Sequence, residues 1–350
     1  MIKGTSLFCN VGIAETYLKK YDIDIVVANE LLKDRAKFYK FCYPDTDVVT
    51  GDITDDEIFN LVVKKSKECG VEFLLATPPC QGMSVAGKMD EHDPRNSLII
   101  KVVDFIKEVK PKNVIIENVP TMLKTSILIN DEKIKIVDYI NSELGNDYKI
   151  SFNILNAADY GTPQTRNRTI VLMSKLGDWK LPEKQRQITV RDAIGWLPSL
   201  ESGQKSDIKY HFAPRHNEKH ILWMKHTPTG KSAFDNKIYF PQKEDGTRIK
   251  GFSTTYKRMS WDKPAPTITM CNGGISSQNN VHPGRLLKDG TYSDARVLSL
   301  KELMILTGLP DDWEIPEWAS ENLVRKVIGE GVPPKLIEAI IKNMPRNDEV

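Results

Sequence analysis

The sequence has little of what marks membrane, secreted or zinc-binding proteins. Across its 350 residues no apolar run approaches the roughly 18 residues that cross a bilayer, so no membrane segment is expected. The start, "MIKGTSLFCNVG", has no long apolar core followed by a small-residue cleavage site, and we expect no signal peptide. The five cysteines are odd in number and include no C-x-x-C pair. This argues against a disulfide framework or a zinc site and for a reducing compartment.

The chain also lacks a strong net charge, which is only +2. The charge is unevenly distributed, because residues 180–262 carry 16 Lys or Arg and 9 Asp or Glu, a net of +7, which leaves −5 for the remainder. A basic middle segment on a slightly acidic body suits a module that faces a polyanion. A solvated lysine-rich surface explains the same count equally well, so both interpretations stay open.

The first 175 residues alternate short apolar runs with helical patterns. In the segment 55–69, Ile58, Leu61, Val62 and the stem of Lys65 share one helix face. The alternation predicts an α/β fold with a doubly wound, mostly parallel sheet, whose active site lies outside the carboxyl ends of the strands. Strands are expected at 6–9, 22–30, 72–79 and 113–119, and helices at 13–21, 31–42, 55–69 and 96–109.

The periodic pattern breaks after the segment "RTIVLMSKLG" and returns near residue 296. We therefore expect a smaller irregular domain, followed by a helix that closes at Gly308 and by a turn and a helix with Pro at its start over 324–343. The expected domains are 1–176 for the catalytic and cofactor-binding domain, 177–295 for the small domain, and 296–350 for the return to the catalytic domain.

Acidic residues follow two of the expected strands. Glu30 lies some twenty residues past the "FCNVG" turn, where nucleotide-binding sheets place an acid on ribose hydroxyls, and Asp52 ends the next run. The first turn lacks the G-x-G-x-x-G pattern, which favours a generic nucleoside ligand over a nicotinamide dinucleotide. Each acid could instead cap the next helix, and for Asp52 taken alone capping is the favoured interpretation.

Two further strand ends carry reactive groups. Cys80 follows two prolines in "LLATPPCQGMS", which provide a rigid mount for a thiol. The Pro-Pro before it and the Gln-Gly after it are poor core formers, which disfavours a buried structural cysteine. Glu117 ends the next strand in "IIENVP". Since neighbouring strand ends meet at one edge, the sequence predicts a thiol beside a carboxylic acid, which indicates covalent catalysis with proton donation to the substrate.

Five segments in fixed order resemble the motifs of the DNA (cytosine-5) methyltransferases, and the resemblance covers nearly the whole chain except the middle insert. They are "PPCQGMS", "ENV", "DYGTPQTRNR", "RVLSLKELMILTGLPDDW" and "VIGEGVPP". The resemblance implies S-adenosyl-L-methionine as cofactor, double-stranded DNA as partner and a cytosine that is flipped out of the duplex. It also implies that residues of about 177–260 form the target-recognition region, and that residues 83–97 form a loop that closes over the flipped base.

The resemblance assigns roles residue by residue. Cys80 is implied to be the nucleophile and Glu117 the acid that contacts the cytosine, with Arg166 and Arg168 as a catalytic arginine pair. DNA contacts are implied for Gln81, Ser84, Arg95, Gln164 and Arg258, and no metal is expected. Cofactor contacts are implied for Phe8, Asn10, Gly12, Glu30, Leu31, Asp52, Ile53, Pro79, Leu98, Glu330 and Val332.

The sequence departs from the family pattern near the expected cofactor. Asn10 and Ile13 replace two glycines of the first turn, and Glu330 stands where an Asn is usual. A tRNA cytosine-5 methyltransferase is the nearest alternative, but the Cys-Phe-Thr tripeptide of those enzymes is missing. A non-catalytic DNA-binding relative would not need Cys80, Glu117 and Arg168.

The expected setting is that of a prokaryotic or phage modification enzyme. Such an enzyme acts in the cytosol as a monomer, and a cognate restriction endonuclease working independently on the same site is an additional partner that the resemblance allows. The sequence gives no recognition site.

Overall fold

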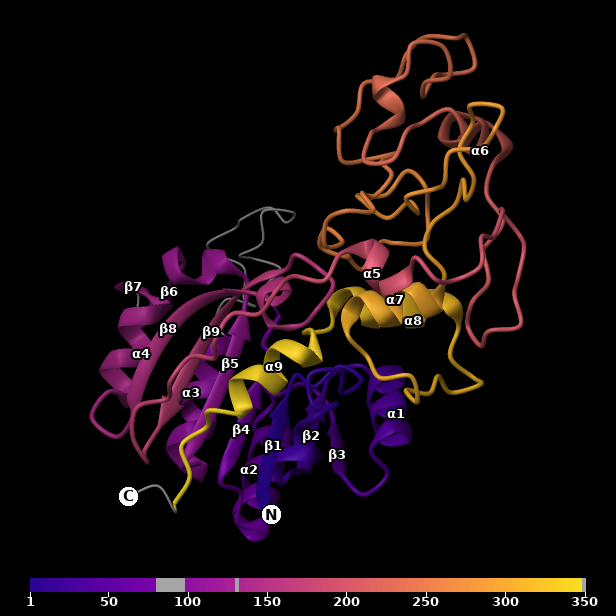
Figure 1. Cartoon of the computed structure of the whole chain (residues 1–350). Coiled ribbons are helices and arrows are strands. Elements are labelled where there is room, and N and C mark those ends of the chain that lie inside the picture. The colour runs from indigo at the N-terminus through magenta and orange to yellow at the C-terminus, as the bar shows by residue number, and fades with distance from the viewer. Residues whose placement is uncertain (80–97, 130–131, 348–350) are drawn as a thin grey trace. The chain divides into compact units, whose positions relative to one another are not determined.

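The computed structural model describes residues 1–79, 98–129 and 132–347 (Figure 1). Contacts between residues divide the chain into two units. The sheet unit comprises Met1–Asn156, Asn167–Lys184 and Pro334–Val350, and the second unit comprises Ala157–Arg166 and Gln185–Pro333. Residues 296–333 thus group with the second unit by their contacts, and the functional division expected at residues 176 and 295 stays a prediction.

A sheet of seven strands organises the sheet unit, in the order β3-β2-β1-β4-β5-β9-β8. Within the described residues, β9 runs antiparallel to β5 and β8 while the other strand pairs of this sheet are parallel, which confirms the expected mostly parallel sheet. The order reverses between β1 and β4, so a crevice is expected outside their carboxyl ends. The strands are β1 (Ile2–Leu7), β2 (Ile23–Glu30), β3 (Asp47–Thr50), β4 (Phe73–Ala76), β5 (Asn113–Asn118), β8 (Lys149–Asn156) and β9 (Asn167–Ser174).

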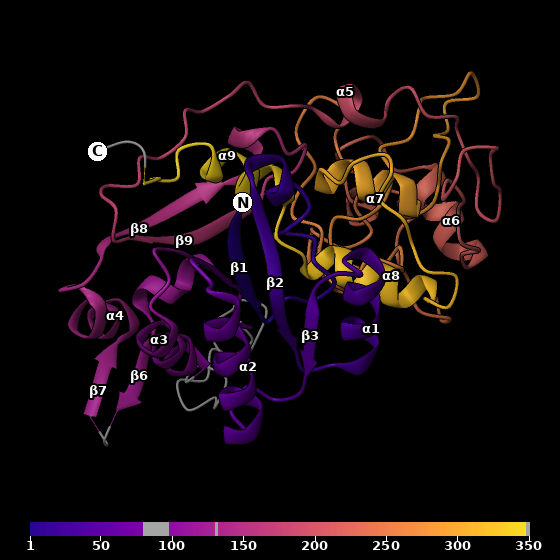
Figure 2. The same cartoon turned by 90° about the horizontal axis from the view of Figure 1, so that it is seen from below.

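Helices cover both faces of this sheet (Figures 1 and 2). α2 (Asp56–Cys69), α3 (Leu98–Val109) and α4 (Ile136–Leu144) pack side by side on one face, where Val62, Val102 and Ile140 join strand residues in one apolar core. α9 (Pro334–Ile341) lies on the other face with the 3₁₀ helix η1 (Leu18–Tyr21), to which Lys20 and Glu338 tie it by an ion pair of 2.8 Å. α1 (Lys33–Cys42) joins β2 to β3. The strands β4 and β5 are buried along their whole length, as continuous apolar runs predict.

Short elements complete the sheet unit. They are the 3₁₀ helix η3 (Pro120–Lys124) and the antiparallel pair β6 (Ser126–Ile129) and β7 (Glu132–Lys135).

The second unit is largely irregular between its helices. It contains η4 (Ala157–Tyr160), α5 (Val190–Ile194), α6 (Glu218–Lys225), η5 (Ala233–Asp235), α7 (Leu300–Thr307) and α8 (Glu321–Glu330). α7 begins at a capping box formed by Ser299 and Glu302 and ends at Gly308, whose left-handed backbone closes the helix as expected. A small apolar core around Trp223, Met224 and Val281 stabilises the irregular part.

Three local predictions are wrong. Residues 13–17 form turns rather than an α-helix, and the N–H of Thr16 bonds three residues back, to Ile13 O, instead of four. The buried face of α2 consists of Phe59, Val62, Val63 and Ser66, whereas Leu61 is exposed. The turn expected at the start of 324–343 is helical as far as Glu330, since α8 extends over it.

No helix in the described ranges is long and apolar enough to cross a membrane. The cysteines of these ranges, Cys9, Cys42, Cys69 and Cys271, are free thiols.

Candidate active site

Hydrogen bonds fasten the ends of β1, β4 and β5 to one another. The Thr77 hydroxyl, just past β4, donates to the carbonyl of Phe8 at 2.9 Å, and the Thr77 N–H donates to Leu7. The Asn118 amide, at the end of β5, donates to the carbonyl of Pro78 at 3.2 Å. The chain that leads to position 80 is therefore held on both sides as far as it is described. Neither Thr77 nor Asn118 was singled out from the sequence, although Asn118 stands beside Glu117 in the "ENV" motif.

Glu117 and Arg168 form a buried ion pair at this edge. The Arg168 Nε lies 2.7 Å from Glu117 Oε1, and Glu117 is only 7% exposed. The pair joins neighbouring strands, because Glu117 belongs to β5 and Arg168 to the start of the antiparallel β9. A guanidinium at this distance orients a carboxyl group and stabilises its charge. The structure thus brings together two of the expected catalytic residues.

The first turn, just after β1, has three residues with positive φ values. Phe8, Asn10 and Gly12 have φ values of 58°, 51° and 81°. Gly12 is required for a second reason, since a Cβ there would lie 2.1 Å from the ring of Tyr43. The Asn10 N–H donates to Glu30 Oε2 at 2.9 Å, which ties the turn to the end of β2.

Glu30 also accepts the N–H of Leu32 on its other oxygen, at 3.0 Å. It therefore orders the entry to α1 as well as the first turn. The neighbouring Leu31 is 57% exposed, an apolar side chain directed away from the core.

The remaining expected cofactor residues of the sheet unit differ in exposure. Asp52 accepts from the N–H and the hydroxyl of Thr54, so it caps its own turn, while Asp55 caps α2. Ile53 is buried in the core. Pro79 and Leu98 are half-buried, and Leu98 opens α3.

Arg166, Glu330 and Val332 belong to the second unit. The Arg166 guanidinium donates to the carbonyls of Ile268, Gly329 and Glu330 at 2.8–3.2 Å. It joins the segment 157–166 to the end of α8. Val332 is buried and Glu330 half-buried.

Two residues expected to contact DNA are structural instead. Gln164 is 1% exposed, and its amide donates to Leu306 O and accepts from Ile268 N. Arg258 is fully buried, and its guanidinium makes five hydrogen bonds to backbone carbonyls of Met224, His282, Ser293 and Asp294. Side chains enclosed in this way are not available to DNA, so their expected DNA contacts are corrected to a fold-stabilising role.

Arg258→Met should therefore destabilise the protein. Burial lowers the pKa of Arg258 to about 10, which still leaves it charged at neutral pH. Removal of its N–H donors leaves buried carbonyls without a hydrogen-bond partner. We expect a loss of at least about 3 kcal/mol in the free energy of unfolding. Arg191→Met is the matched control, because Arg191 pairs with Asp262 on the surface, and it should cost less than about 1 kcal/mol. Denaturant unfolding of the full chain measures both, and equal effects would contradict the assignment.

Cys80, Gln81, Ser84 and Arg95 lie outside the described residues. Their expected roles rest on the sequence.

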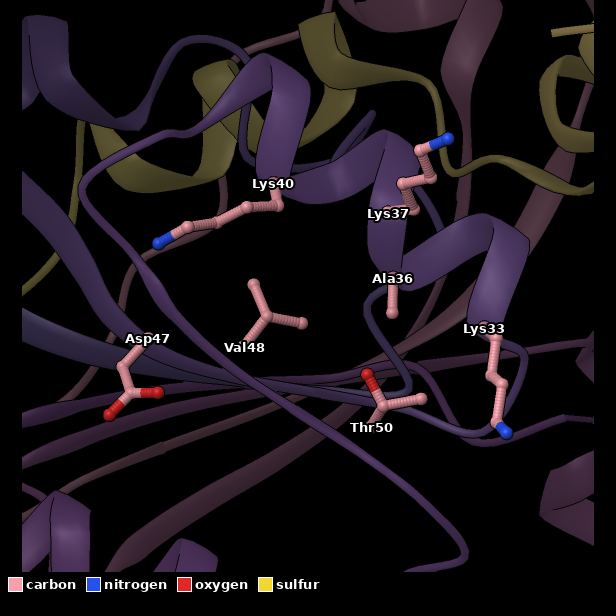
Figure 3. Close-up of a pocket in the computed structure, with 7 residues that line it drawn as sticks. All are labelled: Lys33, Ala36, Lys37, Lys40, Asp47, Val48 and Thr50. Atoms are coloured by element: carbon pink, nitrogen blue, oxygen red, sulfur yellow. The ribbon is translucent and has the colours of Figure 1, made fainter. Parts of the chain in front are cut away.

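A surface pocket of about 350 Å³ lies apart from the candidate site, between α1 and β3 (Figure 3). Its lysines come from α1 and its polar oxygens from β3, and no residue expected to act in the site lines it. The lining residues are Lys33, Ala36, Lys37, Lys40, Asp47, Val48 and Thr50.

Comparisons with solved structures support the fold. The chain matches a DNA modification methyltransferase encoded within an E. coli prophage with a TM-score of 0.67 at 19% identity, covering 98% of both chains. It matches a DNMT2 mutant from Spodoptera frugiperda with a TM-score of 0.65 at 16% identity, covering 98% of this chain and 99% of that one. At these identities the likeness concerns the fold alone.

Comparisons of sequence reach further. The Type II methyltransferase M1.HgaI of Avibacterium volantium is 52% identical over 349 residues, 98% of each chain. The Type II methyltransferase M1.HphI of Haemophilus parahaemolyticus is 30% identical over 311 residues, 86% of this chain and 75% of that protein. The model of the C-5 cytosine-specific DNA methylases matches residues 2–346, and the chain therefore belongs to this family of methyl-transferring enzymes.

Proposed function

We propose that the protein is a type II modification enzyme that methylates carbon 5 of one cytosine within a specific duplex sequence, with S-adenosyl-L-methionine as donor. The observation that carries the proposal is the buried Glu117–Arg168 pair at the strand edge to which the chain before Cys80 is fastened. The similarity to two type II methyltransferases supports the modification role and the rejection of a tRNA substrate or a non-catalytic role.

The residues around the first turn fit an adenosyl donor. Glu30 stands at the end of β2, where nucleotide-binding sheets place an acid on ribose hydroxyls, and exposed Leu31 offers an apolar surface to a purine. We assign donor binding to Phe8, Asn10, Gly12, Glu30, Leu31, Asp52, Ile53, Pro79 and Leu98, with Glu330 and Val332 from the second unit. When bound, the donor supplies an electrophilic methyl group.

The proposed mechanism begins at Cys80. Carbon 5 of cytosine is a poor nucleophile, and the Cys80 thiolate forms a bond to carbon 6 that turns carbon 5 into an enamine-like centre. Glu117 holds a proton at ring nitrogen 3 and so stabilises the charge that develops, while Arg168 fixes the orientation of the carboxyl group. After methyl transfer, carbon 5 loses its proton and the bond to Sγ breaks, which releases 5-methylcytosine and the free thiol.

DNA binding is assigned to the second unit and to residues after Cys80. The target atom cannot be reached inside a duplex, so the cytosine has to be flipped out at a cost of a few kcal/mol. The net +7 charge of residues 180–262 supports an electrostatic contribution, and Gln81, Ser84 and Arg95 stay proposed DNA contacts. Arg166 is proposed to act indirectly, through the carbonyls it holds. We further propose a monomer in the prokaryotic cytosol, with a cognate endonuclease acting independently on the same sequence.

Bisulfite sequencing of a plasmid from cells that express the protein tests the proposal. We expect protected cytosines at one position of one short sequence, and none in cells that carry Cys80→Ala. Unprotected DNA from cells with folded wild-type protein would contradict it. Exchange of residues 177–260 for the matching segment of a relative should change the protected sequence.

A further inference from the structure

A buried carboxyl group lies directly beneath the first turn. Glu15 is 3% exposed, and the hydroxyl of buried Ser6 in β1 donates to its Oε1 at 2.5 Å. Its Oε2 is buried too, and no residue of the described ranges supplies a hydrogen bond to it. No role in the mechanism above uses this acid.

The surroundings of Glu15 oppose a negative charge. Among the described residues, the titratable groups that face it are Cys9 of the first turn, and Tyr39, Cys42 and Tyr43 of α1 and its end, while Glu30 faces Cys9. None of these groups is a cation. Burial raises the pKa values of the Cys9 thiol and of both phenols, so these three groups are neutral at neutral pH. A buried carboxylate without an opposite charge is costly, and the acid is favoured in its neutral form.

Glu15 faces Cys9 of the turn and Tyr43, whose hydroxyl binds the turn. The N–H of Gly12 donates to Cys9 O, and the hydroxyl of Tyr43 donates to Gly12 O at 2.6 Å. The Tyr43 ring packs against that of Tyr39 at a tilt of 37°, with ring centroids 4.8 Å apart. A carboxylate that forms here has to draw in water or rotate toward solvent, and either movement displaces this tightly packed set.

We propose that Glu15 is a positioning residue, which in its neutral form holds the turn of residues 8–12 in the conformation that accepts the methyl donor and which releases that conformation when it ionises. The inference rests on the proposed donor site. Burial raises the pKa of Glu15 to about 7, which brings the change into the neutral range.

The direction of the pH dependence follows from the raised pKa of Glu15. The folded protein holds the proton of Glu15 up to about pH 7, whereas the ordinary value is 4.5. The stabilising effect of the neutral acid is therefore fully present below pH 4.5 and is lost as the pH rises through about 7. The affinity for the methyl donor should likewise fall as the pH rises.

Calorimetric titration of the full chain with S-adenosylhomocysteine, from about pH 6 to about pH 8.5, tests the proposal. The Kd of the wild type should rise by roughly 10- to 30-fold, because only the neutral fraction binds. Glu15→Gln, which keeps an acceptor for Ser6 and cannot ionise, should bind with a Kd that stays nearly constant. Glu68→Gln, an exposed acid on α2, is the matched control and should behave as the wild type.

Ser6→Ala provides a second variant. The Ser6 hydroxyl lowers the pKa of Glu15, so its removal should move the midpoint of the binding curve to higher pH. A merely structural role would weaken binding equally at every pH. The proposal is overturned by equal pH profiles in the wild type and Glu15→Gln.

Thermal unfolding without ligand gives an independent readout. The melting temperature of Glu15→Gln relative to the wild type should rise as the pH increases from about 5 to about 8. A constant difference would overturn the ionisation of Glu15. Failure of both proteins to bind the ligand at any pH, with this melting trend intact, would instead overturn the donor assignment of the proposed function and the donor link of this inference together.

Discussion

Cys80→Ala is expected to lower methyl transfer to DNA by at least about 1,000-fold, because the reaction loses its only way of making carbon 5 nucleophilic. The prediction is derived from the "PPCQ" segment and from the bonds of Thr77 and Asn118 that fix the chain just before it. Incorporation of labelled methyl groups into duplex DNA measures the loss.

DNA binding provides the control for this variant. A thiol-to-methyl change removes no expected DNA contact, so the affinity for the recognition sequence in a gel-shift assay should stay within about threefold. Turnover within about tenfold of the wild type would contradict a nucleophilic role for Cys80.

Glu117→Gln is expected to lower kcat by about 100- to 1,000-fold. The amide keeps the size of the side chain but removes the proton that stabilises the charged ring, and it breaks the 2.7 Å pair with Arg168. Arg168→Lys keeps the positive charge and loses the planar Nε contact, so a smaller decrease of about tenfold is expected. Single-turnover methylation at saturating DNA measures both variants.

The rate of the Glu117→Gln, Arg168→Lys double variant shows whether the two residues act together. If Arg168 acts by orienting Glu117, the double variant should be no slower than Glu117→Gln alone. Additive losses would mean that Arg168 acts on the substrate independently. A Glu117→Gln variant with normal kcat would contradict the assignment of the acid.

Much of this edge could be predicted because buried parallel strands leave a clear signal. The apolar run before Glu117 corresponds to β5, which is buried throughout, and Glu30 ends β2 as expected. The pairing of Glu117 with Arg168 could not be predicted from the sequence. It depends on β9 lying antiparallel beside β5, and the sequence pattern does not contain that register.

The errors come from side chains whose burial depends on distant segments. Arg258 adds to the positive charge of residues 180–262, yet its N–H groups donate to backbone carbonyls. These carbonyls lie from 34 residues before it to 36 residues after it in the chain. Gln164 is enclosed in the same way by Leu306 and Ile268. Glu15 lies in a segment expected to be a helix, whereas turns bring it inward onto Ser6. Charge and periodicity describe local preference, and tertiary hydrogen bonds decide these cases.

Covalent trapping tests the central claim most directly. Duplex DNA with 5-fluorocytosine at the methylated position is incubated with the protein and S-adenosyl-L-methionine, and the products are separated under denaturing conditions. Because fluorine cannot leave as a proton does, we predict an adduct that survives denaturation for the wild type and none for Cys80→Ala. Methylation of the unmodified site without any adduct on the fluorinated one would contradict the covalent route through Cys80.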